Sequence, residues 1–143
     1  LDIINKIATA QQAKETIRIL KENDIEARIY LIIGLPGEPE DIVEQTWSFI
    51  KETAPDLVYL SLFTVRPGTE VFNNPKKFGI RRIFTEWDKA MHMFRRYDKN
   101  EVPALTFEYE EQTPWGKGPS NEKIVNDYMQ LQENIKEHGF GPF

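Results

Sequence analysis

The chain has 143 residues, 40% apolar and 12% aromatic, which is enough for one packed domain and argues against global disorder. A net charge of −5 argues against a nucleic-acid-binding surface. Because cysteine is absent and only two histidines occur, the sequence excludes disulfides and cysteine-ligated metals within these residues, and it predicts no metal site. No apolar run reaches the roughly 20 residues that cross a bilayer. The lack of cysteine fits a reducing compartment, so we expect a cytoplasmic protein without a membrane span.

The first predicted element is a helix that begins after Thr9. Thr9 and Gln12 have the spacing of a capping box, in which each side chain bonds the backbone N–H of the other residue. Apolar residues then recur at helical spacing over residues 13–20. The Asn-Asp pair at 23–24 can end the helix in a left-handed conformation. Isoleucines within residues 3–7 suggest one or two further helical turns before it.

Two apolar runs, 27–33 and 57–63, are predicted to be strands covered on both faces, as in a parallel sheet. Between them we expect a helix with Pro39 at its first position, acidic residues in its first turn, and an end at Pro55. Its predicted buried face consists of Ile42, Val43, Thr46, Trp47 and Ile50. About 23 residues separate the two runs, which is the length of a right-handed βαβ crossover. The two strands should therefore be parallel neighbours.

Beyond Gly79 the pattern changes. Residues 86–97 have the apolar spacing of a helix, and residues 103–111 alternate like a strand with one solvent-exposed face. The Pro- and Gly-rich stretch 112–121 is predicted to be a loop. A last helix is predicted from Ser120 to Gly139. Its expected buried face consists of Ile124, Tyr128, Leu131 and Ile135.

The stretch IIGLPGEPED, residues 32–41, joins a predicted strand end to a predicted helix start. This layout brings backbone N–H groups to the carboxyl edge of a parallel sheet, where ligands bind in such folds. Gly34 and Gly37 let another group approach the backbone closely, although a tight turn that needs glycine only for its dihedral angles explains them equally well. The stretch is neither a P-loop nor a dinucleotide-binding fingerprint. Its acidic residues disfavour a phosphate, so we expect a neutral or cationic group or an apolar ring.

Three further features each have two interpretations. Arg66 follows the second strand and either meets a ligand carboxylate or forms a surface ion pair. Glu108, Glu110 and Glu111 either act in acid–base chemistry or form the solvated face of a strand, which we favour. Trp115 either stacks on a substrate or folds onto the core, and we favour the core.

Residues 1–75 resemble the fifth and sixth βα units of radical S-adenosylmethionine (SAM) enzymes, and the strings IIGLPGE and RPGTEVF carry this resemblance. It is closest to the cobalamin-domain-containing subgroup typified by anaerobic magnesium-protoporphyrin IX monomethyl ester oxidative cyclases. The resemblance implies an α/β fold, a fragment of a partial TIM barrel built from parallel βα units. Residues 1–78 would be the last units of the barrel, and residues 79–143 a mostly helical C-terminal extension.

The resemblance also implies that SAM binds at the carboxyl edge of the barrel, with its methionine end on a [4Fe-4S] cluster and its adenine near the last two strands. Cobalamin is a further candidate cofactor. We expect no catalytic and no metal-ligating residue in this chain, because the three-cysteine loop of the family is absent. The candidate cofactor-binding residues are Ile32, Ile33, Gly34, Leu35, Pro36, Gly37, Glu38, Phe63, Val65 and Arg66.

The implied parent protein is an oxidoreductase that cleaves SAM reductively and abstracts a hydrogen atom from a small-molecule substrate. Cyclisation of a magnesium tetrapyrrole is the reaction we favour. A methylthiotransferase, a methyltransferase and a non-catalytic α/β interaction module are the alternatives. The chain itself is then an inactive C-terminal piece. We expect its exposed strand edges to self-associate, unless the strand at 103–111 closes the sheet.

Overall fold

The computed structural model describes residues 9–85 and 104–141, so the helices predicted at 3–7 and 86–97 lie outside the described residues. The elements, in chain order, are α1 (Ala10–Glu22), β1 (Arg28–Ile33), α2 (Ile42–Thr53), β2 (Leu57–Leu62), α3 (Glu70–Asn73), the 3-10 helix η2 (Pro75–Phe78), β3 (Ile80–Ile83), β4 (Phe107–Tyr109), β5 (Gln112–Thr113), β6 (Gly116–Lys117) and α6 (Asn121–Glu137).

The predicted boundaries of α1 are confirmed. The Thr9 side chain accepts a hydrogen bond from the Gln12 N–H at 3.2 Å, and the Gln12 side chain accepts one from the Thr9 N–H at 2.8 Å. Both bonds of the capping box are therefore present. At the other end Asp24 has a left-handed backbone with φ of 57°.

Strands β1 and β2 form a parallel pair, as predicted, in register from Arg28 opposite Leu57 to Ile33 opposite Leu62. Helix α2 connects them, and it ends at Thr53, just before Pro55. The fold is therefore mixed α/β, with a parallel strand pair and a helical C-terminus, which is compatible with a radical SAM fragment.

The predicted start of α2 at Pro39 is wrong. The helix begins at Ile42 with Asp41 as its N-cap residue, and the Asp41 side chain makes no capping bond. That carboxylate instead accepts from the side-chain amide of Gln45 at 2.8 Å. The Glu38 N–H bonds the Leu35 carbonyl in a separate turn before Pro39, and the helical bonding starts only with the bond from the Gln45 N–H to the Asp41 carbonyl at 3.0 Å.

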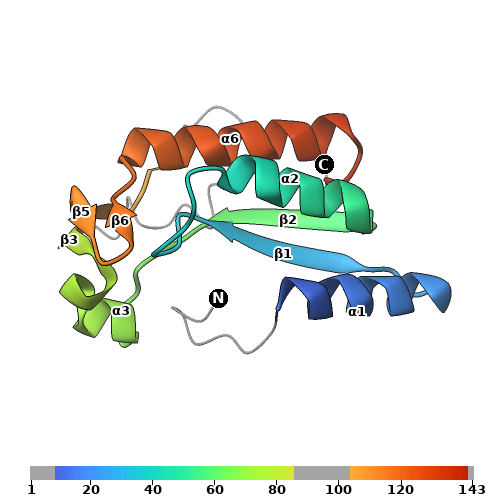
Figure 1. Cartoon of the computed structure of the whole chain (residues 1–143), viewed down its shortest axis with the longest axis horizontal. Helices are drawn as coiled ribbons and strands as arrows, with labels where there is room; N and C mark the ends of the chain where they lie inside the picture. The colour runs from blue at the N-terminus through green and yellow to red at the C-terminus, as the bar shows by residue number, and fades with distance from the viewer. Residues whose placement is uncertain (1–8, 86–103, 142–143) are drawn as a thin grey trace.

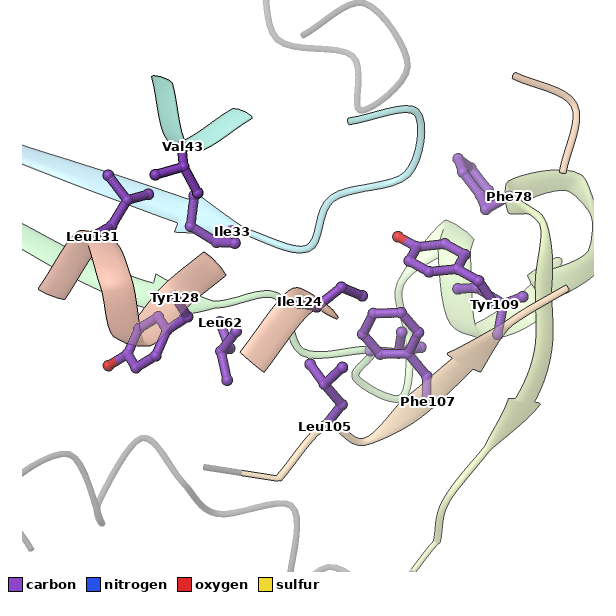
Figure 2. Close-up of a cluster of buried hydrophobic side chains, with 12 residues drawn as sticks. Ile33, Val43, Leu62, Phe78, Leu105, Phe107, Tyr109, Ile124, Tyr128 and Leu131 are labelled. Carbon is purple, nitrogen blue, oxygen red and sulfur yellow. The ribbon is translucent and has the colours of Figure 1, made fainter. Parts of the chain in front are cut away.

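Helices α2 and α6 lie over the same face of the β1–β2 sheet (Figure 1). Helix α6 begins where it was predicted, directly after Ser120. The Ser120 side chain caps it by accepting a hydrogen bond from the Lys123 N–H at 3.1 Å. The predicted buried face of α6 is confirmed and comprises Ile124, Tyr128, Leu131 and Ile135. The larger of two core clusters joins these elements to β4 (Figure 2). Because residues on both sides of residue 78 share this core, the parallel unit and the C-terminal extension pack together.

The two faces of the sheet differ in burial. On the face under α2 and α6, Ile33 and Leu62 are buried. On the opposite side, which we call the open face, Tyr30 is 71% exposed and Ile32 is 45% exposed. The Tyr30 ring stacks on the ring of its cross-strand neighbour Tyr59, with 4.7 Å between centroids.

The described residues of the C-terminal extension add short antiparallel pairs rather than a third strand to the sheet. Strand β4 pairs with β3, so the expectation that residues 103–111 close the β1–β2 sheet is wrong. The predicted buried face is confirmed, since Leu105, Phe107 and Tyr109 are all buried, but the strand covers only Phe107–Tyr109 and the expected solvent-exposed face is wrong at Thr106, which is 1% exposed. The predicted loop at 112–121 contains the small β5–β6 hairpin. Within the described ranges, no helix has the length and apolar character needed to cross a membrane.

Candidate functional site

The candidate site is the turn Gly34–Glu38, which follows β1 at the carboxyl edge of the sheet. The end of β2 lies at the same edge, because the Phe63 N–H donates to the Ile33 carbonyl at 2.8 Å. The strand arrowheads in Figure 1 point to this edge, and the short β3–β6 strands and α3 gather beyond it. The structure therefore brings the two glycine-containing segments that follow β1 and β2 to one side of the sheet, as parallel pairing requires.

The conformation of the turn needs its two glycines. Gly34 has φ of 93° and Gly37 has φ of 72°, both in the left-handed region that side-chain-bearing residues rarely adopt. Gly34 is buried and Gly37 is exposed. The dihedral angles alone therefore account for glycine at both positions.

A carboxylate from within the turn satisfies its backbone N–H groups. The two oxygens of Glu38 accept from the Gly34 N–H at 2.8 Å and from the Leu35 N–H at 3.2 Å. Burial raises the pKa of Glu38 to about 7, and these two backbone bonds act in the opposite direction. Of the nearby charges, Asp127 raises this pKa and Lys123 lowers it.

This role of Glu38 was not predicted from the sequence. We expected the N–H groups at the strand end to be available to a ligand, whereas two of them bond the side chain of Glu38. An acidic residue four positions after a strand-ending glycine was the signal present in the sequence. The N–H groups of Gly34 and Leu35 are therefore bonded within the turn and do not form a free pair for an anion.

The C-terminal extension covers one side of Gly34. A Cβ atom built on Gly34 would lie 2.9 Å from Cγ2 of Ile124, so only glycine fits beneath the first turns of α6. The Tyr109 hydroxyl donates to the Gly34 carbonyl at 2.8 Å in a buried setting. Burial raises the pKa of Tyr109, and the neighbouring Glu38 adds to that shift. On this side the close neighbour of Gly34 is the chain itself, so a ligand can approach the turn only from elsewhere.

The apolar candidate residues divide between the two sides of the sheet. Ile32 lies on the open face, while the side chains of Ile33 and Val65 are each 1% exposed and belong to the core. Phe63 is half-buried, and its ring meets the Phe107 ring edge-on with 5.5 Å between centroids. At Ile33 and Val65, therefore, only backbone atoms are available to a ligand.

The remaining candidates surround the turn. Pro36 is buried, Leu35 is half-buried and Arg66 is exposed. The Arg66 carbonyl accepts from the Thr69 hydroxyl at 2.7 Å, and this bond shapes the Pro-Gly turn after β2. Leu35 and Arg66 thus retain side-chain surface at the carboxyl edge.

The side chains of Glu108 and Trp115 are partly exposed to solvent. Glu108 forms an ion pair with Arg81 at 2.9 Å, which fits the solvated-face interpretation. Trp115 is 43% exposed, so the expectation that it folds onto the core is wrong. Among residues 9–85 and 104–141, no group of three or more His, Cys, Asp or Glu side chains could hold a metal ion. Since the chain has no cysteine, it cannot supply the cluster ligands that the family resemblance implies.

Comparison with curated proteins finds partial relatives of two kinds. The anaerobic magnesium-protoporphyrin IX monomethyl ester cyclase of Cereibacter sphaeroides is 38% identical over 72 residues, which is 50% of this chain and 12% of the cyclase. The cyclase of the same name from Rubrivivax gelatinosus is 32% identical over 72 residues, 50% of this chain and 13% of that protein. The tRNA-2-methylthio-N(6)-dimethylallyladenosine synthase of Treponema denticola is 33% identical over 76 residues, 52% of this chain and 17% of the synthase.

These relatives are several times longer than the matched segment, which spans 12% to 17% of their length. No protein-family model matches the chain. No solved structure matches it either. About half of the chain is therefore similar to enzymes of the radical SAM family, and the matches do not select one subgroup of that family.

Proposed function

We propose that this chain carries two βα units of a radical SAM barrel, together with the turn against which the adenosine part of SAM binds. The observation that carries the proposal is the parallel β1–β2 pair ending in the Gly34–Glu38 turn, in a chain half of which is similar to radical SAM enzymes. In parallel α/β folds, ligands bind at this carboxyl edge.

In this proposal the adenine ring reaches the turn from the open face. Ile124 and Tyr109 cover Gly34 on the other side, whereas Ile32 presents a 45% exposed apolar side chain next to the turn. A flat heterocycle gains from contact with such a surface. The capped N–H groups of Gly34 and Leu35 fit a ligand that brings no anionic group to the turn.

The reactive chemistry depends on residues outside this chain. SAM bound to a [4Fe-4S] cluster supplies the radical that abstracts a hydrogen atom from the substrate, and the cluster ligands would come from another part of the protein. In this proposal the residues of this chain bind and orient the adenosine. The larger core cluster behind the turn keeps water away from it. The whole protein would be a cytoplasmic oxidoreductase, and the isolated chain would be inactive.

For the reaction we favour cyclisation of magnesium-protoporphyrin IX monomethyl ester, with cobalamin as a candidate further cofactor. The 38% identity to the Cereibacter sphaeroides cyclase supports this choice. A tRNA methylthiolation is the second candidate, because the Klebsiella pneumoniae strain 342 synthase is 37% identical over 71 residues. The net charge of −5 favours the small-molecule substrate over RNA.

Binding of SAM tests the proposal. The full-length protein that contains this sequence would be reconstituted anaerobically with iron and sulfide, and its SAM affinity measured by equilibrium dialysis. We expect Ile32→Lys to weaken binding at least tenfold. Ile19→Lys is the matched control, because Ile19 on α1 is 47% exposed and remote from the turn. A reconstituted protein without iron absorbance, or equal weakening by both variants, contradicts the proposal.

The two reactions are separated by their products. The reconstituted protein would be incubated with SAM, a reductant and either the magnesium tetrapyrrole or tRNA, and the products would be analysed by mass spectrometry. Formation of a cyclised tetrapyrrole supports the favoured reaction, and a methylthiolated adenosine supports the second.

A further inference from the structure

Two distant parts of the chain meet at a single residue of the turn. Glu38 accepts a hydrogen bond from the Gly34 N–H. Tyr109, which lies 75 residues after Gly34 in the chain, donates one to the Gly34 carbonyl. Both polar backbone groups of Gly34 are thus bonded to side chains. Together these two bonds fix the orientation of the peptide groups on either side of Gly34.

The Tyr109 hydroxyl has a specific role in this arrangement. Phenylalanine would fill the core beside Phe107 equally well, and the two rings here meet edge-on at 5.0 Å between centroids. A buried hydroxyl is costly unless it has a hydrogen-bond partner, and the Gly34 carbonyl is that partner. The Tyr109 hydroxyl therefore adds a hydrogen bond to the turn, which the packing of the ring alone would not provide.

Helix α6 holds the turn at two further points. Ile124 packs against Gly34 closely enough to exclude any side chain there. One residue before it, the Lys123 ammonium donates to the Glu40 carbonyl at 3.1 Å and also pairs with Asp127. The first two turns of α6 thus contact the beginning of the turn and the segment that leads from it into α2.

We propose that β4 and the start of α6 form a positioning element for the Gly34–Glu38 turn, with Tyr109 and Ile124 as its two positioning residues. The C-terminal extension then sets the backbone geometry on which SAM binding depends, although Tyr109 and Ile124 contact Gly34 on the side away from the ligand. This inference rests on the proposed function for the identity of the ligand. The positioning itself rests on the contacts alone.

The first experiment measures the order of the turn without any ligand. Amide hydrogen exchange of the 143-residue chain would be followed by NMR in the wild type and in Tyr109→Phe. We expect the Gly34 and Leu35 amides to exchange at least fivefold faster in the variant, relative to the Ile29 amide in β1, because one buried hydrogen bond is lost. Equal relative exchange in the two proteins overturns the inference, whether or not SAM binds.

A matched pair on α6 separates positioning from general packing. Ile124→Ala and Ile135→Ala each remove a buried isoleucine side chain from the same helix, and Ile135 packs against Ile50 and Val58 in the second core cluster. Only Ile124→Ala should speed exchange at Gly34 relative to Ile29. If Ile135→Ala changes that ratio to the same extent, Ile124 is not a positioning residue.

The second experiment measures the consequence for SAM. In the reconstituted full-length protein we expect Tyr109→Phe to weaken SAM binding about tenfold and Ile135→Ala to leave it unchanged. If the wild type binds no SAM, the proposed function fails, while the exchange ratios still decide whether the positioning element exists. If the wild type and Tyr109→Phe bind SAM with equal affinity, the hydrogen bond from Tyr109 to Gly34 does not influence SAM binding, and that part of the inference is overturned.

Discussion

The two faces of the β1–β2 sheet are built from the same two strands yet have different surroundings. The covered face packs under α2 and α6, and its residues Ile33, Val58 and Leu62 are at most 7% exposed. The open face exposes Ile32 at 45% and Tyr30 at 71%. Because successive side chains of a strand point to opposite faces, the neighbouring residues Ile32 and Ile33 lie on the open face and the covered face respectively.

The difference between the two faces indicates that one face of this sheet serves stability and the other serves binding. The helices and the C-terminal extension complete one hydrophobic layer and fix the turn from that side. The open face keeps apolar and aromatic side chains that suit contact with a further layer or a ligand. Stability should therefore depend on the covered face, and binding on the open one.

Truncation of a core ring should have the largest effect. Phe107 is 0% exposed and contacts the rings of Phe63 and Tyr109, so we expect Phe107→Ala to lower the free energy of unfolding by about 3–5 kcal/mol. Tyr30→Ala on the open face should cost about 1 kcal/mol, chiefly from the lost stack on Tyr59. Urea unfolding followed by circular dichroism measures both. Equal losses would show that the open face is as well packed as the covered one.

The next largest effect concerns the proton on Glu38. Burial raises its pKa in the folded chain to about 7 from 4.5, so the folded state binds this proton more tightly than the unfolded state does. The resulting stabilisation is fully present below about pH 4.5 and is lost as the pH rises through 7, up to about 3 kcal/mol in total. We expect the wild type to lose stability between pH 5.5 and 8 relative to Glu38→Gln, whose side chain does not titrate.

The measurement is the free energy of unfolding across this pH range. Glu40→Gln provides the control, since it makes the same chemical change at an exposed position two residues away. Glu40→Gln should follow the pH profile of the wild type. If Glu38→Gln follows that profile too, the Glu38 carboxylate is already charged across the range.

A smaller effect is expected in association. Within the described residues, β1 has no strand partner other than β2, so the outer edge of β1 is unpaired by any strand, whereas on the outer edge of β2 the Val58 N–H donates to the Phe140 carbonyl at 2.8 Å. We expect the isolated chain to self-associate at the β1 edge, and Ile32→Lys to weaken association about tenfold by placing a charge at the contact. Multi-angle light scattering over a concentration series gives the readout, with Ile19→Lys as the control. A strictly monomeric wild type would show that this edge does not pair.

Local sequence signals predicted the elements that local interactions form. The capping box at Thr9 and Gln12 needs only residues three apart, and it is present, as is the predicted helix start at Ser120. The parallel pairing followed from the length of the crossover, since a helix between two strands leaves few other topologies. These features could be predicted because few alternatives exist at short range.

The environment of the turn could not be predicted in the same way. Nothing in the local pattern around Gly34 indicates that Tyr109 and Ile124 will reach it, because these contacts depend on how the extension folds back. The error at Pro39 has a related cause. Proline suits the first position of a helix, but here the turn closed by Leu35 and Glu38 ends before Pro39, and the helical bonds begin beyond it with the one from the Gln45 N–H to the Asp41 carbonyl. Where a turn carries its own hydrogen bonds, they outweigh the preference of a single residue.

The smallest effect compares the starts of the two helices that cover the sheet. Ser120 caps α6 through a bond from the Lys123 N–H, whereas the Asp41 side chain caps no N–H of α2. We therefore expect Ser120→Ala to cost about 1 kcal/mol of stability and Asp41→Ala only a few tenths, from its weaker interaction with the helix dipole. Thermal unfolding of the two variants side by side measures the difference. Equal losses would mean that the Asp41 side chain caps α2 in solution.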